Sequence, residues 1–201
     1  RQTRLGLQSV CQKSAMNRAV KTLLLAEGFF LFASGLLGPI WAVYVEDIGG
    51  DILDASGAFG LFMLTAALVT YVLSKIEDRQ RHKAKFVVFG YLIGVIGYTG
   101  YIFVESTFQL LLVQAILGLT VAIKDPAYDG LFSKFAKKHI TLAWGEWEAM
   151  DYLTTGASAI VGGLIAKFFG FKTLIFLMIA FSLVGLLTSL SLLRLKRLIK
   201  G

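Results

Sequence analysis

The chain has 201 residues, of which 56% are hydrophobic and 16% charged, and its formal net charge is +7. A soluble domain carries about 25% charged residues, so this composition, with apolar runs of about 20 residues, indicates a membrane protein. The basic residues flank the apolar runs instead of collecting on one soluble face, which argues against a nucleic-acid-binding domain. A single cysteine, Cys11, excludes an intrachain disulfide bond.

Six apolar segments predict an all-α, polytopic membrane fold with six transmembrane helices. Residues 1–16 are polar and basic, and we expect them to form a flexible leader before a transmembrane domain over residues 17–201. Pro39 is expected to kink the first helix, and Asp54 is expected to cap the second. The helices are expected at about residues 20–44, 53–76, 86–104, 108–132, 142–169 and 171–195.

The basic residues predict the orientation of these helices. Seventeen of the 20 Lys and Arg residues fall in the leader, in the loops that precede residue 86 and follow residue 132, and in the C-terminal tail. All four segments lie on one side of a six-helix arrangement, and connectors rich in Lys and Arg stay in the cytoplasm. We therefore expect both termini in the cytoplasm, and we expect the protein in the cytoplasmic membrane of a prokaryote.

A row of glycines marks one face of the third predicted helix. Gly90, Gly94 and Gly97 follow one another at helical spacing. Small residues in such a row let a neighbouring helix approach closely. Packing within the bundle is the expected role of this row, in preference to a functional site.

Several ionisable side chains fall within the apolar segments, and four of them are candidate site residues: Glu27, Lys124, Asp125 and Asp151. A charge at mid-membrane costs about 2.5–3.5 kcal/mol, so such residues are rare and usually functional. At 1.5 Å per residue, Glu27 and Asp151 each lie about 10 Å from the inner boundary, and the other two lie in the same leaflet. We expect the first, fourth and fifth helices, which carry these residues, to face a water-accessible cavity, and the sixth to face lipid.

Two interpretations of the acidic residues remain open. In the functional one, the cavity binds a polar or cationic solute, and Glu27 or Asp151 takes up a proton during coupling. In the structural one, Asp125 and Asp129 bond to Arg79 or Arg81 in the loop between the second and third helices. Glu146 and Glu148 then extend to the inner membrane surface.

That loop resembles a motif of the major facilitator superfamily of transporters. It reads S-K-I-E-D-R-Q-R-H-K over residues 74–83, where the family has G-x-L-A-D-R-x-G-R-K. Asp78, Arg79 and Lys83 match the motif, whereas both glycines and one arginine are replaced. The segments around Pro39, over residues 118–131 and over residues 162–171 are also similar to the family's first helix end, fourth helix and fifth-to-sixth junction.

The resemblance covers about residues 17–200, which correspond to the amino-terminal half of a family whose members usually contain two such halves. It implies that Asp78, Arg79 and Lys83 form a cytoplasmic gating loop, with Asp125 or Asp129 as the acidic partner. It also implies that the first and fourth helices line the cavity, the second and fifth meet the other half, and the third and sixth face lipid.

We therefore predict a half-size secondary active transporter that carries a small solute by alternating access. It would work as a homodimer or with a second six-helix half, and its buried carboxyls would be available for proton coupling. The alternative is a non-transporting membrane scaffold or regulatory subunit. The sequence contains no HExxH, G-x-S-x-G or P-loop motif, so an enzyme is not expected. The expected partners are the lipid bilayer and a solute, without a cofactor, a metal or nucleic acid.

Overall fold

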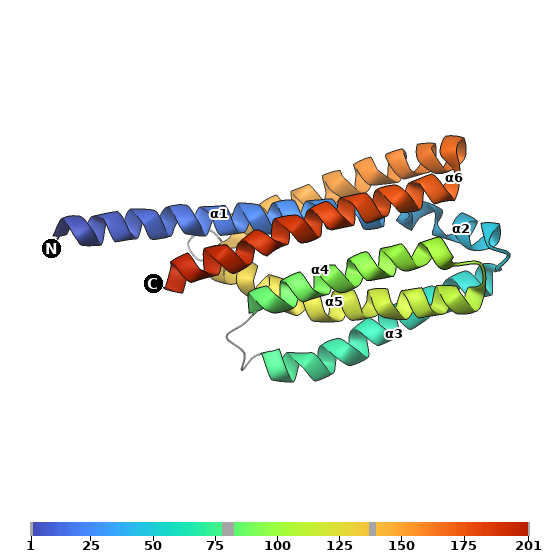
Figure 1. Ribbon diagram of the computed structural model, residues 1–201, viewed down its shortest axis with the longest axis horizontal. Helices are drawn as coiled ribbons and strands as arrows, with labels where there is room; N and C mark the ends of the chain where they lie inside the picture. Colours follow the sequence, from blue (N-terminus) through green and yellow to red (C-terminus); the bar gives the residue numbers. More distant parts are fainter. Residues whose placement is uncertain (1, 78–82, 137–139, 201) are drawn as a thin grey trace.

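The computed structural model describes residues 2–77, 83–136 and 140–200, and every regular element within these ranges is a helix. The long helices run along a common axis (Figure 1). Five helical segments are long and apolar enough to cross a membrane: Arg18–Asp47, Ile52–Leu73, Lys83–Phe103, Thr107–Ala136 and Ile140–Arg194. The prediction of an all-α membrane fold is therefore confirmed.

The first predicted helix is divided into separate helices and is not merely kinked. The α-helix α1 spans Gln2–Gly35, the 3-10 helix η1 spans Gly38–Ile40, and α2 spans Trp41–Asp47. The proline ring clashes with the carbonyl four residues earlier, and for Pro39 that carbonyl belongs to Gly35, the last residue of α1. Because α1 begins at Gln2, it includes most of the predicted leader, whose mobility stays a prediction.

The second predicted helix agrees closely with α3, which spans Ile52–Glu77, but its cap is different. The backbone N–H groups of Leu53 and Asp54 donate to Asp51 Oδ1 at 2.7 and 2.9 Å. In return, Asp54 Oδ2 accepts a hydrogen bond from the Asp51 N–H at 3.0 Å. Asp51 is thus the cap and Asp54 its reciprocal partner in a capping box, which corrects the predicted cap by three residues.

The glycine row packs α4 against α5. The helix α4 spans Lys83–Gly100, continues as η2 over Tyr101–Phe103, and is followed by α5 over Thr107–Ala136. A Cβ added at Gly90 would lie 2.6 Å from Lys124 Cβ, and one added at Gly97 would lie 2.6 Å from Leu117 Cδ2. The predicted packing role is confirmed, and at Gly90 it brings the backbone of α4 directly against Lys124.

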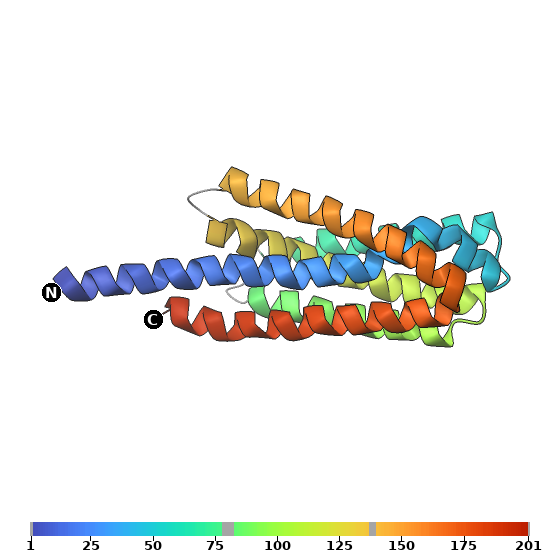
Figure 2. The ribbon, with the colours of Figure 1, turned by 90° about the horizontal axis from the view of Figure 1, so that it is seen from above.

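The last element, α6, spans Ile140–Lys200 and reverses direction at Gly170, where φ is 81° and ψ is 168°. Glycine adopts this positive φ without the steric cost that a Cβ would impose. Residues 140–169 form the first arm of α6 and residues 171–200 the second arm. Figure 2 shows α1 between these two arms, so the N-terminal helix packs against both. The reversal falls where the sequence predicts the boundary between the fifth and sixth helices.

The helix ends define two ends of the bundle. Lys75 in the last turn of α3, Lys83 at the start of α4 and Lys134 in the last turn of α5 mark one end, which we call the basic end. The start of α1 and the end of α6 lie toward the same end (Figure 1). The turn between α2 and α3, the turn between η2 and α5, and the reversal of α6 lie at the opposite end, which we call the far end.

Candidate functional site

A buried ion pair connects α1 to α5. Glu27 is 4% exposed and Lys124 is 3% exposed, and Lys124 Nζ lies 2.5 Å from Glu27 Oε1. From α4, the Tyr91 hydroxyl donates a hydrogen bond to Glu27 Oε2 at 2.6 Å. Both carboxylate oxygens of Glu27 therefore have a donor. Buried charges persist only when they are paired and hydrogen-bonded in this way.

Asp125 extends this pair into a three-residue cluster. Lys124 Nζ lies 2.8 Å from Asp125 Oδ1, and the Asp125 side chain is 45% exposed. One ammonium group is thus held by two carboxylates. We call Glu27, Lys124 and Asp125 the charged cluster; its formal charge is −1 when all three side chains are ionised. Aromatic rings surround the ammonium, with centroids 5.4 Å away at Phe30, 5.5 Å at Tyr91 and 5.7 Å at Tyr128.

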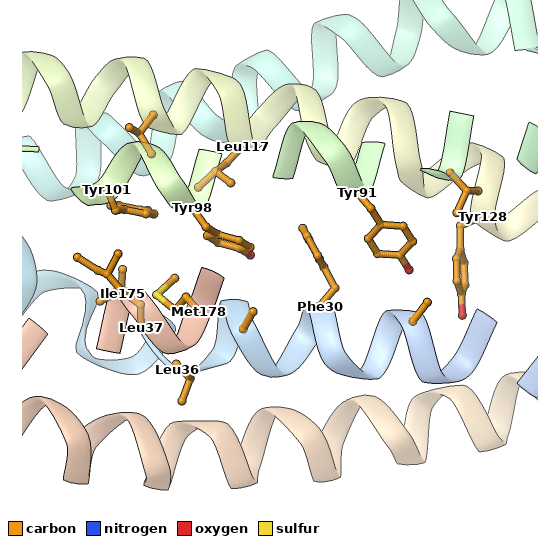
Figure 3. Close-up of a cluster of buried hydrophobic side chains, with 14 of the residues drawn as sticks. Phe30, Leu36, Leu37, Tyr91, Tyr98, Tyr101, Leu117, Tyr128, Ile175 and Met178 are labelled. Carbon is orange, nitrogen blue, oxygen red and sulfur yellow. The ribbon is translucent and has the colours of Figure 1, made fainter. Parts of the chain in front are cut away.

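The charged cluster lines a cavity of about 410 Å³, which we call the central cavity. Helix α1 contributes Glu27 and Phe30 to its wall, and α5 contributes Lys124 and Asp125. Figure 3 shows Phe30 reaching from α1 between Tyr91 and Tyr98 of α4, with the Tyr91 hydroxyl directed toward α1. The rest of the wall combines aromatic and aliphatic residues with a few polar ones: Trp41, Phe59, Phe62, Tyr98, Tyr101, Leu31, Leu37, Gly38, Leu117, Val121, Met178, Ser34, Gln114 and Thr120.

The spacing of residues on α5 explains why its charged side chains divide into two sets. Residues four apart share a helix face, so Lys124 lies with Tyr128 and Asp125 lies with Asp129. The structure buries Lys124 and Tyr128, and it leaves Asp125 half-buried and Asp129 exposed. Asp125 can therefore touch the ammonium while part of its carboxylate remains open to the cavity.

Asp151 does not join the charged cluster. It is half-buried on the first arm of α6, and its Oδ1 accepts a hydrogen bond at 3.1 Å from Thr155 of the same helix. Among the described residues that line the central cavity, none comes from this arm. The expectation that the fifth predicted helix faces this cavity is therefore wrong. The distance along the sequence predicted the membrane depth of Asp151, but it could not predict which way this face of the helix points.

The predicted gating loop is described only in part. Asp78 and Arg79 lie outside the described residues. Lys83 lies against α5, where its ammonium occupies the space that a Cβ on Gly130 would need. Asp129 precedes Gly130 in sequence and is exposed. The two described members thus lie on neighbouring helices at the basic end, and their gating role stays a prediction.

Sequence reasoning did not identify Tyr91, which completes the coordination of Glu27. A tyrosine in an apolar run is usually a packing residue, and its partner is 64 positions away in sequence. The available signal was its position directly after Gly90, in the row that brings α4 onto α5. In the described part of the chain, no group of three His, Cys, Asp or Glu side chains is arranged to hold a metal ion.

A polytopic helical bundle with charges buried beside a cavity at membrane depth has the architecture of a membrane transport protein. The chain belongs to the Major Facilitator Superfamily, whose family model matches residues 23–199. It is therefore a multi-pass integral membrane protein of a transporter family, and the resemblance drawn from the sequence is confirmed.

Three relatives illustrate the breadth of this similarity. The tetracenomycin C resistance and export protein of Streptomyces glaucescens is 24% identical over 150 residues, which are 72% of this chain and 27% of that protein. The uncharacterized MFS-type transporter YitZ of Bacillus subtilis (strain 168) is 26% identical over 69% of this chain and 84% of its own length. The uncharacterized MFS-type transporter MJ1560 of Methanocaldococcus jannaschii is 24% identical over 69% of this chain and 36% of its own length.

Proposed function

We propose that this chain forms a six-helix half of a secondary transporter, which moves a small solute across the cytoplasmic membrane of a prokaryote by alternating access. The observation that carries the proposal is the buried Glu27–Lys124 pair beside the central cavity. Charges at membrane depth are costly, and in membrane proteins they mark solute and ion pathways. The basic end of the bundle would face the cytoplasm together with both termini, because Lys-rich connectors stay inside.

Each predicted site residue has a place in this proposal. Asp125 would meet the solute, because it is the half-exposed acid of the charged cluster, while Glu27 and Lys124 would complete the site and supply a group for proton coupling. Asp151 lies away from the cavity, and we assign it to the surface that meets the second half. The cytoplasmic gate would comprise the predicted loop residues and their acidic partner: Asp78, Arg79, Lys83 and Asp129.

A second six-helix half would enclose the pathway, and a twofold homodimer would provide it. Helix α3 has the least protein cover of the membrane spans, with 17% of its most apolar window buried against 33–44% for the others. Leu64 and Leu68 of α3 are 63% and 68% exposed, and Ile160 on the first arm of α6 is 69% exposed. In an isologous dimer, α3 of one copy would pack against the first arm of α6 of the other.

Site-directed crosslinking tests this dimer. Leu64 is 12 residues and Ile160 is 10 residues from the far-end limits of their helical segments, so both lie about 15–18 Å deep. In a Cys11→Ser background, one tagged copy carrying Leu64→Cys and a second carrying Ile160→Cys are expected to crosslink in liposomes. Phe89→Cys on α4, at a position 52% exposed, is the control and is expected to remain uncrosslinked with Ile160→Cys. Equal crosslinking of both pairs, or none, would contradict the dimer.

Transport itself is tested in reconstituted liposomes. A labelled panel of amino acids, sugars, nucleosides, organic cations and organic anions is offered with and without a pH gradient. At least one solute is expected to enter faster than into protein-free liposomes, and Asp125→Asn is expected to reduce that uptake by roughly tenfold or more, since it removes a charged partner. Glu148→Gln removes an exposed carboxylate outside the cavity and is the matched control. Uptake indistinguishable from protein-free liposomes for the whole panel would refute the transport function.

A further inference from the structure

We propose that the central cavity binds amphipathic organic cations, meaning compounds with an aromatic or apolar body and one positive charge, and that Asp125 is their counter-ion. The inference rests on the proposed transport function and names the class of solute. It follows from three features of the site: the charge of the cluster, the cation that the cluster already holds, and the chemistry of the cavity wall.

The charged cluster has one carboxylate in excess. Glu27 is buried and receives donors on both oxygens, one from Lys124 and one from Tyr91. Asp125 has its Oδ1 on the same ammonium, but its side chain remains 45% exposed and lines the cavity. The surplus negative charge is therefore on the side where a solute would enter. A cation would neutralise this charge, whereas an anion would add to it.

The site already contains a cation of the protein itself, the ammonium group of Lys124. The Lys124 ammonium contacts two carboxylates and lies 5.4–5.7 Å from the centroids of three aromatic rings. Carboxylate and ring faces together are the groups that attract organic ammonium ions in proteins. When a cationic solute binds Asp125, Lys124 can keep its bond to Glu27. The solute cation then takes the place of the Lys124 ammonium at Asp125, and no buried charge is left without a partner.

The wall of the cavity fits an apolar body better than a polar one. Aromatic side chains from α1, α2, α3, α4 and η2 form much of it, including Phe30, Trp41, Phe62 and Tyr98. A volume of about 410 Å³ lies within the range of sites that enclose drug-sized molecules. A sugar would leave most of its hydroxyl groups facing aromatic carbon. An aromatic or alkylated cation would cover these rings while its charge reaches Asp125.

Two ions of matched shape and opposite sign test the proposal. Tetraphenylphosphonium and tetraphenylborate differ chiefly in charge, and their binding to the full chain is measured by equilibrium dialysis in nanodiscs, with empty nanodiscs as background. Saturable binding of tetraphenylphosphonium is expected, without binding of tetraphenylborate above background. Asp125→Asn is expected to lower the affinity for the cation by roughly tenfold or more. Glu148→Gln is expected to leave that affinity unchanged.

A second variant keeps the test decisive. Asp125→Glu retains a carboxylate at this position, so the site keeps its charge of −1. It is expected to recover most of the cation affinity that Asp125→Asn loses, to within about threefold of the wild type. Preference of the wild type for tetraphenylborate, or cation binding that is unaffected by Asp125→Asn, would overturn the proposal. Cation binding without uptake would count against transport alone, whereas uptake of another solute without cation binding would overturn the solute class alone.

Discussion

Replacing Lys124 with methionine is expected to destabilise the protein by about 3–5 kcal/mol, because Glu27 would then be buried without its counter-ion. Glu27 is 4% exposed and would retain only the Tyr91 hydrogen bond. The loss is measured as the change in thermal denaturation midpoint in detergent, read from tryptophan fluorescence. Glu27→Gln alone is expected to be destabilising for the complementary reason, since the Lys124 ammonium would lose its buried partner.

The double variant, Glu27→Gln with Lys124→Met, shows whether these losses come from one interaction. Two residues in direct contact are expected to be non-additive, so the double variant should be clearly less destabilised than the sum of the single ones. Glu148→Gln, on an exposed position of α6, is the control and is expected to change stability by less than about 0.5 kcal/mol. Small and additive single effects would mean that the buried pair does not form.

Replacing Gly162 with alanine is expected to cost about 3 kcal/mol, at the upper end of the range for overpacking. The added Cβ would overlap the carbonyl oxygen of Leu36 and would lie 2.7 Å from its carbonyl carbon. These are backbone atoms in the break between α1 and η1, so they cannot rotate away as a side chain would. The first arm of α6 would have to separate from α1 to relieve the overlap.

The adjacent glycine supplies a matched comparison. Gly163 lies on the same helix, and a Cβ added there would meet no heavy atom within 4 Å. Gly163→Ala is expected to be neutral or to stabilise by up to about 1 kcal/mol, because alanine is the better helix former. Both variants are compared by thermal midpoint and by size-exclusion profile. Equal behaviour of the two would contradict the close contact between α6 and Leu36.

The spans could be predicted from the sequence because hydrocarbon thickness fixes the length of an apolar run. The bounds of α3 and α5 agree with prediction to within four residues, and the reversal at Gly170 lies between the predicted fifth and sixth helices. Close helix packing was also predictable from the row at Gly90, Gly94 and Gly97. Glycines at this helical spacing let a neighbouring helix approach closely.

The residues of the site could be predicted from the sequence only to the extent that they share one depth in the membrane. Residue spacing placed Glu27, Lys124 and Asp125 at one level of the membrane, and the structure brings all three together. The same reasoning placed Asp151 at that level, but the rotation of its helix turns it away from the cavity. Tyr91 was missed for the same reason, because its role depends on which face of α4 meets α1. Rotation about the helix axis is set by packing partners, which spacing alone does not supply.

The separation of Glu27 and Lys124 in the chain has a consequence for biogenesis. The two residues that neutralise each other are 97 positions apart. At a synthesis rate of about 5–20 residues per second, the acidic helix leaves the ribosome roughly 5–20 s before its lysine. During that interval Glu27 must be protonated, hydrated at the translocon or covered by a chaperone. The buried packing of α1 around Glu27 is therefore expected to be completed only after α5 has been made.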